Sequence, residues 1–226
     1  MKEALSLLFV AIVWLNPNTS WSQYPQVDFV FGYLPFDRSC EGWTKQPIEQ
    51  SWYDELRAQL PAFRSEWSKE APVLLGETVA ALNAPFRRNE LTAFITLCAI
   101  QSMSIPLIIN GRLFLPSPMK QNPWPLSRFS VIVFHEILHT HLPPLYAGKS
   151  QLLAKYKDET PVARNHLHLF SVMKHIYLKL GREQQLSEII TIDSSGNDPS
   201  YARAWEIVNK VEGYEPFMTE LRGRER

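Results

Sequence analysis

The stretch from residue 129 to residue 142 limits the fold more than any other part of the chain. It reads Phe-Ser-Val-Ile-Val-Phe-His-Glu-Ile-Leu-His-Thr-His-Leu, and Glu136 is its only acidic or basic residue apart from histidine. A helix that is apolar around most of its circumference is buried in a domain, and a carboxylate buried with it is costly unless it has a partner or a function. We therefore expect a central helix that ends before Pro143 and Pro144.

Within this stretch, His135-Glu136-Ile137-Leu138-His139 places two imidazoles one helical turn apart. Residues at i and i+4 lie on the same face of a helix, so His135 and His139 are directed toward one point, as two ligands of a metal ion are. Glu136 is rotated about 100° from His135, where its carboxylate reaches a metal-bound water without binding the metal. We take the two histidines as candidate zinc ligands and Glu136 as the candidate catalytic base.

This motif resembles the H-E-x-x-H motif of the zincin metallopeptidases, and the resemblance covers the motif helix and the order of elements around it. The metzincin branch is excluded, because Leu142 and Leu145 stand where that branch has a glycine and its third ligand. The gluzincin branch takes its third ligand from a glutamate on a following helix, which here corresponds to Glu159, although Ala163 replaces an aspartate often found four residues later. The resemblance implies Zn²⁺ as cofactor and a peptide or protein as substrate.

The third metal ligand stays open between Glu159 and His166. All six histidines of the chain fall between residues 135 and 175, which suggests that two segments face each other across one site, and zinc accepts either donor. We favour Glu159. His166 then becomes a candidate catalytic residue that donates a hydrogen bond to the oxyanion of a tetrahedral intermediate, with Tyr156 and Tyr177 as weaker candidates for that role.

Residues 1–22 have the features of an export signal. Lys2 precedes an apolar run over residues 5–15, and Ser20 and Ser22 are small residues suited to a cleavage site. The run is shorter than the roughly 18 residues that a bilayer crossing requires. We expect a mature protein that is secreted or periplasmic and has no membrane span after signal cleavage.

The remaining 23–226 segment is expected to form one domain, since a chain of 226 residues with 45% hydrophobic residues builds one well-buried core. Its 23 Lys and Arg residues balance 23 Asp and Glu residues, so net charge gives no reason to expect a nucleic-acid partner. In an oxidising compartment Cys40 and Cys98 can form a disulfide, although two separate buried thiols explain them as well. The oligomeric state is left open.

Apolar periodicity indicates the other elements. Residues 91–100 have the pattern of a buried strand, and Asn110-Gly111 predicts a tight hairpin turn between apolar segments. Pro61 is expected to bend or divide the helix that contains it. Further helices are expected over residues 47–67, 73–82, 150–156, from 159 or 161 to 180, and over 201–211. Together these elements predict an α+β, zincin-like fold. In this fold a small mixed or antiparallel sheet packs on the motif helix, and a helix that carries the third ligand follows the motif helix in the chain.

Two other functions are consistent with the same residues. An exported zinc-binding structural or interaction protein without catalytic activity would close its site with four protein ligands, which requires both Glu159 and His166. A helical interaction domain without metal would be folded and insensitive to a chelator. We favour zinc-dependent hydrolysis of peptide bonds, because the motif combines two metal ligands with a base.

Overall fold

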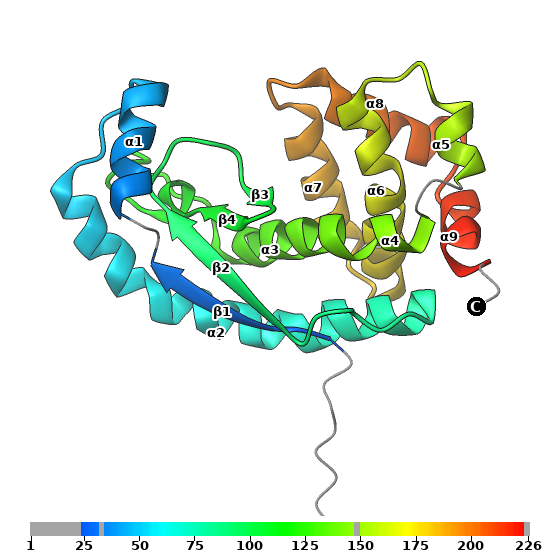
Figure 1. Ribbon diagram of the computed structural model, residues 1–226, viewed down its shortest axis with the longest axis horizontal. Helices are drawn as coiled ribbons and strands as arrows, with labels where there is room; N and C mark the ends of the chain where they lie inside the picture. The colour runs from blue at the N-terminus through cyan, green and yellow to red at the C-terminus, as the bar shows by residue number, and fades with distance from the viewer. Residues whose placement is uncertain (1–23, 32–33, 147–149, 224–226) are drawn as a thin grey trace, which may run out of the picture.

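Helix α3 (Leu126–His141), which carries the histidine motif, runs through the middle of the structure (Figure 1). Phe129, Phe134 and Leu138 on this helix are fully buried, as the apolar stretch predicts. The computed structural model describes residues 24–31, 34–146 and 150–223, so the export signal expected over residues 1–22 lies outside the described residues. Among those residues, no helix has both the length and the apolar character needed to cross a bilayer.

Four strands form one mixed sheet in the order β1-β2-β4-β3. The first three run parallel, and β3 pairs antiparallel with β4 at the edge. The fully buried ring of Phe29 on β1 contacts the ring of Phe129 on α3, with centroids 5.2 Å apart. The predicted α+β class with a small mixed sheet is confirmed. The strands are β1 (Gln26–Phe31), β2 (Glu90–Thr96), β3 (Met103–Ser104) and β4 (Leu107–Asn110).

Helices α1 (Leu34–Thr44) and α2 (Gln50–Leu82) connect β1 to β2. Parallel neighbours need such a crossover. The helices expected over residues 47–67 and 73–82 form one helix, and the alternative that Pro61 divides its helix is wrong, because α2 is continuous across Pro61 and Pro72. Each proline removes one helical hydrogen bond, but the buried face of α2 extends past both prolines and packs on α3, where Phe63 stacks on Phe129 at 4.4 Å between ring centroids.

The hairpin predicted at Asn110-Gly111 is also wrong. Strand β4 ends at Asn110, and Gly111–Phe114 form a 3-10 helix, η1. The Asn110 side chain accepts a hydrogen bond from the backbone N–H of Arg112 at 3.1 Å and so caps η1. A Cβ atom at Gly111 would lie 2.5 Å from Cγ2 of Ile95. Glycine is therefore required here by close packing against β2, and the antiparallel pair is β3 and β4.

The C-terminal helices gather beside the C-terminal half of α3, on the right in Figure 1. Trp205 of α8 stacks on Phe170 of α6 with ring centroids 4.1 Å apart, and both side chains are fully buried. The helix expected over residues 201–211 begins earlier and ends in a π-helical turn, η2 (Ile207–Val211). The other elements are α4 (Pro143–Tyr146), α5 (Gln151–Lys155), α6 (Pro161–Lys179), α7 (Glu183–Ser194), α8 (Pro199–Glu206) and α9 (Glu215–Arg222).

Helix α1 is held to the end of β2 by two links. Cys40 and Cys98 form a disulfide with Cα atoms 5.7 Å apart, which decides between the two sequence-based alternatives. The hydroxyl of Thr96 donates a hydrogen bond to the buried carboxylate of Asp37. These links fix the start of the segment after β2, whose residues 99–102 line a cavity beside α3.

Candidate metal centre

Three histidines from two helices converge on one point. The Nε2 atom of His135 lies 3.1 Å from Nε2 of His139 and 3.3 Å from Nε2 of His166. One ligand atom from each of the three rings lies within 4.8 Å of the other two. A tetrahedral zinc ion with bonds of about 2.0–2.1 Å holds neighbouring nitrogen ligands roughly 3.3 Å apart. The spacing of the three imidazoles therefore fits a metal ion.

Helix packing brings His166 to this group. It lies in the second turn of α6, a helix that begins at Pro161 and is capped by the Thr160 hydroxyl, which accepts a hydrogen bond from the Ala163 N–H at 3.1 Å. The rings of His166 and His139 are perpendicular, with centroids 4.8 Å apart. The motif supplies two of the donors by helical periodicity, and the contact between α6 and α3 supplies the third.

The ring nitrogens are arranged for metal binding. Nδ1 of His166 lies 2.7 Å from the carbonyl oxygen of Val162, and because a carbonyl only accepts, Nδ1 carries the hydrogen and Nε2 presents a lone pair. Nε2 of His135 has two imidazole nitrogens at hydrogen-bond distance and at most one hydrogen to offer. A cation bound by three lone pairs satisfies all three nitrogens.

Burial keeps the three imidazoles neutral. It lowers the pKa of His135 well below its ordinary value, with the neighbouring imidazoles as a further cause. Burial, and then the proximity of His166, lowers the pKa of His139 to about 4. Burial also lowers the pKa of His166. Neutral imidazole is the form that binds metal, so the group is ready for a cation at neutral pH.

Glu136 lies where two cavities meet. A cavity of about 640 Å³, the first cavity, is lined by His135 and Glu136, and a second cavity of about 690 Å³ is lined by Glu136 and His139. Glu136 is 7% exposed, and burial raises its pKa to about 8. A cation beside it would favour the carboxylate form again. Glu136 is therefore shared by the linings of both cavities.

The first cavity has walls from distant parts of the chain. Its lining comes from residues 99–102, from η1 with the loop after it, from α3, and from α7, α8 and the loop between them. The sequence offered no prediction for α7. The cavity size is within the range of small-molecule and peptide sites.

Tyr201 is a residue of the site that the sequence did not single out. It lies on α8 and lines the first cavity with Glu136. Its ring lies 4.4 Å from the His166 ring and 6.4 Å from the His135 ring, centroid to centroid. Burial raises its pKa to about 12, so the hydroxyl remains a donor at neutral pH. Only helix packing places it here, because no local pattern marks Tyr201.

The structure does not bring Glu159 to the histidines. Its Oε1 atom accepts hydrogen bonds from Nε and Nη2 of Arg203 at 2.9 and 2.7 Å. Glu159 precedes the capping residue Thr160 and therefore lies outside α6, so it does not share the helix face of His166. Among the described residues, the group that could hold a metal ion contains His166 and not the expected Glu159.

The other candidates lie apart from the centre. The Tyr156 hydroxyl donates to Glu212 at 2.6 Å, Tyr177 is fully buried, and neither residue lines the two cavities. His141 stacks on Phe86 with ring centroids 3.9 Å apart.

No family model, curated protein or solved structure matches this chain.

Proposed function

We propose that this protein is a zinc-dependent hydrolase of peptide bonds, with His135, His139 and His166 as the zinc ligands. The observation that carries the proposal is the convergence of the three Nε2 atoms beside Glu136, where two cavities meet. Zinc bound here would lower the pKa of a bound water toward ~7 and polarise a carbonyl group. The protein would be zincin-like, with a histidine in place of the glutamate ligand of the gluzincin branch.

The number of donors supports a catalytic site over a structural one. Among the described residues the metal-binding group has three members. Catalytic zinc sites combine three protein ligands with an open position for water, whereas structural sites are closed by four. The alternative function, an exported structural zinc protein, required Glu159 as a further ligand, and Glu159 is paired with Arg203.

We assign Glu136 and Tyr201 to the chemistry. Glu136 accepts a proton from the attacking water and then donates it to the leaving nitrogen of the cleaved amide. The Tyr201 hydroxyl, in the same cavity, donates a hydrogen bond to the oxygen that gains negative charge in the transition state. The Cys40–Cys98 disulfide supports our expectation of a secreted or periplasmic protein, because disulfides persist in oxidising compartments.

The experiment combines zinc analysis with cleavage of a peptide library by the full chain. We expect one zinc ion per chain and cleavage by the wild type. Glu136→Gln is expected to keep its zinc and lose cleavage, since a general base contributes roughly 10²–10⁴-fold to the rate. Glu159→Gln, the matched control, is expected to retain both. A wild-type protein with a full zinc complement that cleaves no peptide would favour the structural alternative, and wild-type rates in Glu136→Gln would remove that residue as the base.

A further inference from the structure

Arg112 is an arginine without an acidic partner in the first cavity. It lies on η1 and lines the cavity together with Glu136 and His135. Its Nη1 atom is buried and has no hydrogen-bond partner, and no ion pair between described residues includes it. An arginine that lines a cavity and has no carboxylate of the protein paired with it is a natural site for an anionic ligand.

The other charged side chains of this cavity have partners, apart from the catalytic Glu136. Nη2 of Arg128 lies 2.7 Å from Oδ1 of Asp193, and both side chains are largely buried. The carboxylate of Asp198 accepts a hydrogen bond from the Ser200 N–H at 2.9 Å at the start of α8. Among the arginines of this lining, Arg128 is thus paired with a carboxylate through Nη2, whereas Arg112 forms no ion pair with a described residue.

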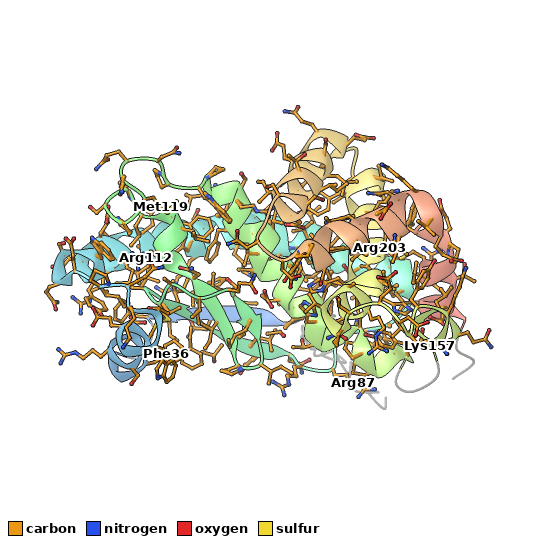
Figure 2. The ribbon with its side chains drawn as sticks, turned by 90° about the horizontal axis from the view of Figure 1, so that it is seen from above. Phe36, Arg87, Arg112, Met119, Lys157 and Arg203 are labelled. Atoms are coloured by element: carbon orange, nitrogen blue, oxygen red, sulfur yellow. A yellow bond between two sulfur atoms is a disulfide. The ribbon has the colours of Figure 1, made fainter. Side chains whose placement is uncertain are left out.

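The position of Arg112 is fixed before a ligand arrives. Its guanidinium carbon lies 4.7 Å from the centroid of the Trp52 ring, which supports it by a cation–π contact. Its backbone N–H is bound by the Asn110 side chain, whose Nδ2 donates to the carbonyl of Ile100 at 2.8 Å. Figure 2 shows Arg112 and Met119 on one side of the molecule, away from Arg203 and the C-terminal helices. Arg112 therefore lines the first cavity from η1, whereas Tyr201 lines it from α8.

From these contacts we infer that Arg112 forms a subsite for a carboxylate of the substrate. The planar guanidinium matches a carboxylate in geometry, and such a charge-assisted pair is strong in a partly buried cavity. The carboxylate can belong to an acidic side chain or to the free C-terminus of a peptide. The inference deepens the proposed function, since it names peptides with a carboxylate near the cleaved bond as the substrate class.

The test measures binding of three N-acetylated tetrapeptides by calorimetry to the full chain as purified, in the Glu136→Gln background. The probes are Ala-Ala-Ala-Glu amide, Ala-Ala-Ala-Gln amide and Ala-Ala-Ala-Gln with a free C-terminus. Alanine imposes no side-chain preference, so the peptide is free to place its carboxylate at Arg112. We expect at least one carboxylate peptide to bind about tenfold or more tightly than the Gln amide, and the two acidic probes distinguish a side-chain carboxylate from a C-terminal one.

Arg112→Met is expected to reduce the preference for the carboxylate peptide over the Gln amide to less than about twofold. Arg112→Gln is expected to give the same loss, and agreement between the two variants guards against a folding defect in one of them. Arg88→Met, an arginine change in the second cavity, is the control and is expected to keep the preference. Equal binding of all three peptides, no binding of any, or a preference that survives in both Arg112 variants overturns the inference. If the preference depends on Arg112 but the wild-type protein cleaves no peptide, the carboxylate subsite is supported and only the proposed hydrolase function is rejected.

Discussion

The Nε2 atoms of His135 and His166 lie 3.3 Å apart, although the two histidines are 31 residues apart in sequence and lie on different helices. Two neutral imidazoles at this distance share at most one hydrogen bond, and Nε2 of His139 approaches His135 as well. The packing of α6 against α3 therefore gathers three imidazole nitrogens at a spacing that one metal ion can bridge.

His166→Ala is expected to weaken zinc binding by more than roughly 100-fold, because loss of a direct ligand exceeds the 10–100-fold cost of losing an outer partner. Glu159→Ala is expected to leave zinc affinity unchanged, because its carboxylate is bound to Arg203. Competition with a chromophoric chelator measures both affinities. The reverse order, with zinc lost in Glu159→Ala and kept in His166→Ala, would restore the gluzincin-type ligand set.

Tyr201→Phe is expected to lower kcat by roughly 100-fold, as the loss of a donor to the transition-state oxygen does. Zinc content and KM are expected to change little, because the aromatic ring beside His135 and His166 is retained. Tyr156→Phe is the control, since that hydroxyl is bound to Glu212 away from both cavities. An unchanged kcat in Tyr201→Phe would leave the hydroxyl without a catalytic role.

The start of the helix α5 depends on Glu220 of α9. Its carboxylate accepts hydrogen bonds from the Ser150 hydroxyl and the Gln151 N–H, both at 2.6 Å, and its Oε2 lies 2.6 Å from Nε2 of His168. Burial raises the pKa of Glu220, but the hydrogen bonds from Ser150 and His168 outweigh this effect, so the pKa lies below its ordinary value of 4.5. The ionised form of Glu220 therefore stabilises the folded state.

The sign of the pH dependence follows. The folded chain binds fewer protons at Glu220 than the unfolded chain does, so this contribution is present above pH 4.5 and is lost as the pH falls through the lowered pKa. Glu220→Gln is expected to lower the free energy of unfolding at pH 7 by about 1–3 kcal/mol and to make its decline toward pH 3 shallower than in the wild type. Urea unfolding with a chelator present measures both. Parallel pH profiles for the two proteins would contradict the prediction.

The disulfide between Cys40 and Cys98 closes a loop with a sequence separation of 58 residues. Changing both cysteines to serine is expected to lower the free energy of unfolding by about 2–4 kcal/mol, mainly because the unfolded chain gains freedom. Urea unfolding of the oxidised wild type and of the double variant gives the difference. Equal midpoints, or two thiols that react with a labelling reagent in the untreated protein, would show that the bond does not contribute.

Local sequence was sufficient for the motif helix and for the donors that it carries. The run from residue 129 to residue 142 is apolar around most of the helix, which predicts a buried helix, and Phe129 and Phe134 are buried accordingly. The sequence did not decide between Glu159 and His166 as the third donor, because zinc accepts either side chain and the choice depends on where α6 begins. That start is fixed by the Thr160 cap, and Arg203, from a helix much later in the chain, takes the Glu159 carboxylate.

The strands before the motif were misjudged for a similar reason. Asn110-Gly111 has the composition of a hairpin turn, yet Asn110 caps a 3-10 helix and Gly111 makes room for Ile95 of a neighbouring strand. Tyr201 and Arg112 line the same cavity from elements far apart in the sequence, and no periodicity within either segment predicts that they do. Tertiary packing therefore determines the residues that complete the site.

The most direct test of the metal centre is X-ray absorption spectroscopy at the zinc edge on the purified full chain. We expect three imidazole nitrogens and one further light atom from water, at distances near 2.0–2.1 Å. The His166→Ala protein, measured in parallel, should show fewer imidazoles or no bound zinc. A wild-type spectrum with two imidazoles and a carboxylate, with four protein ligands, or with no zinc retained by the folded protein would contradict the three-histidine site.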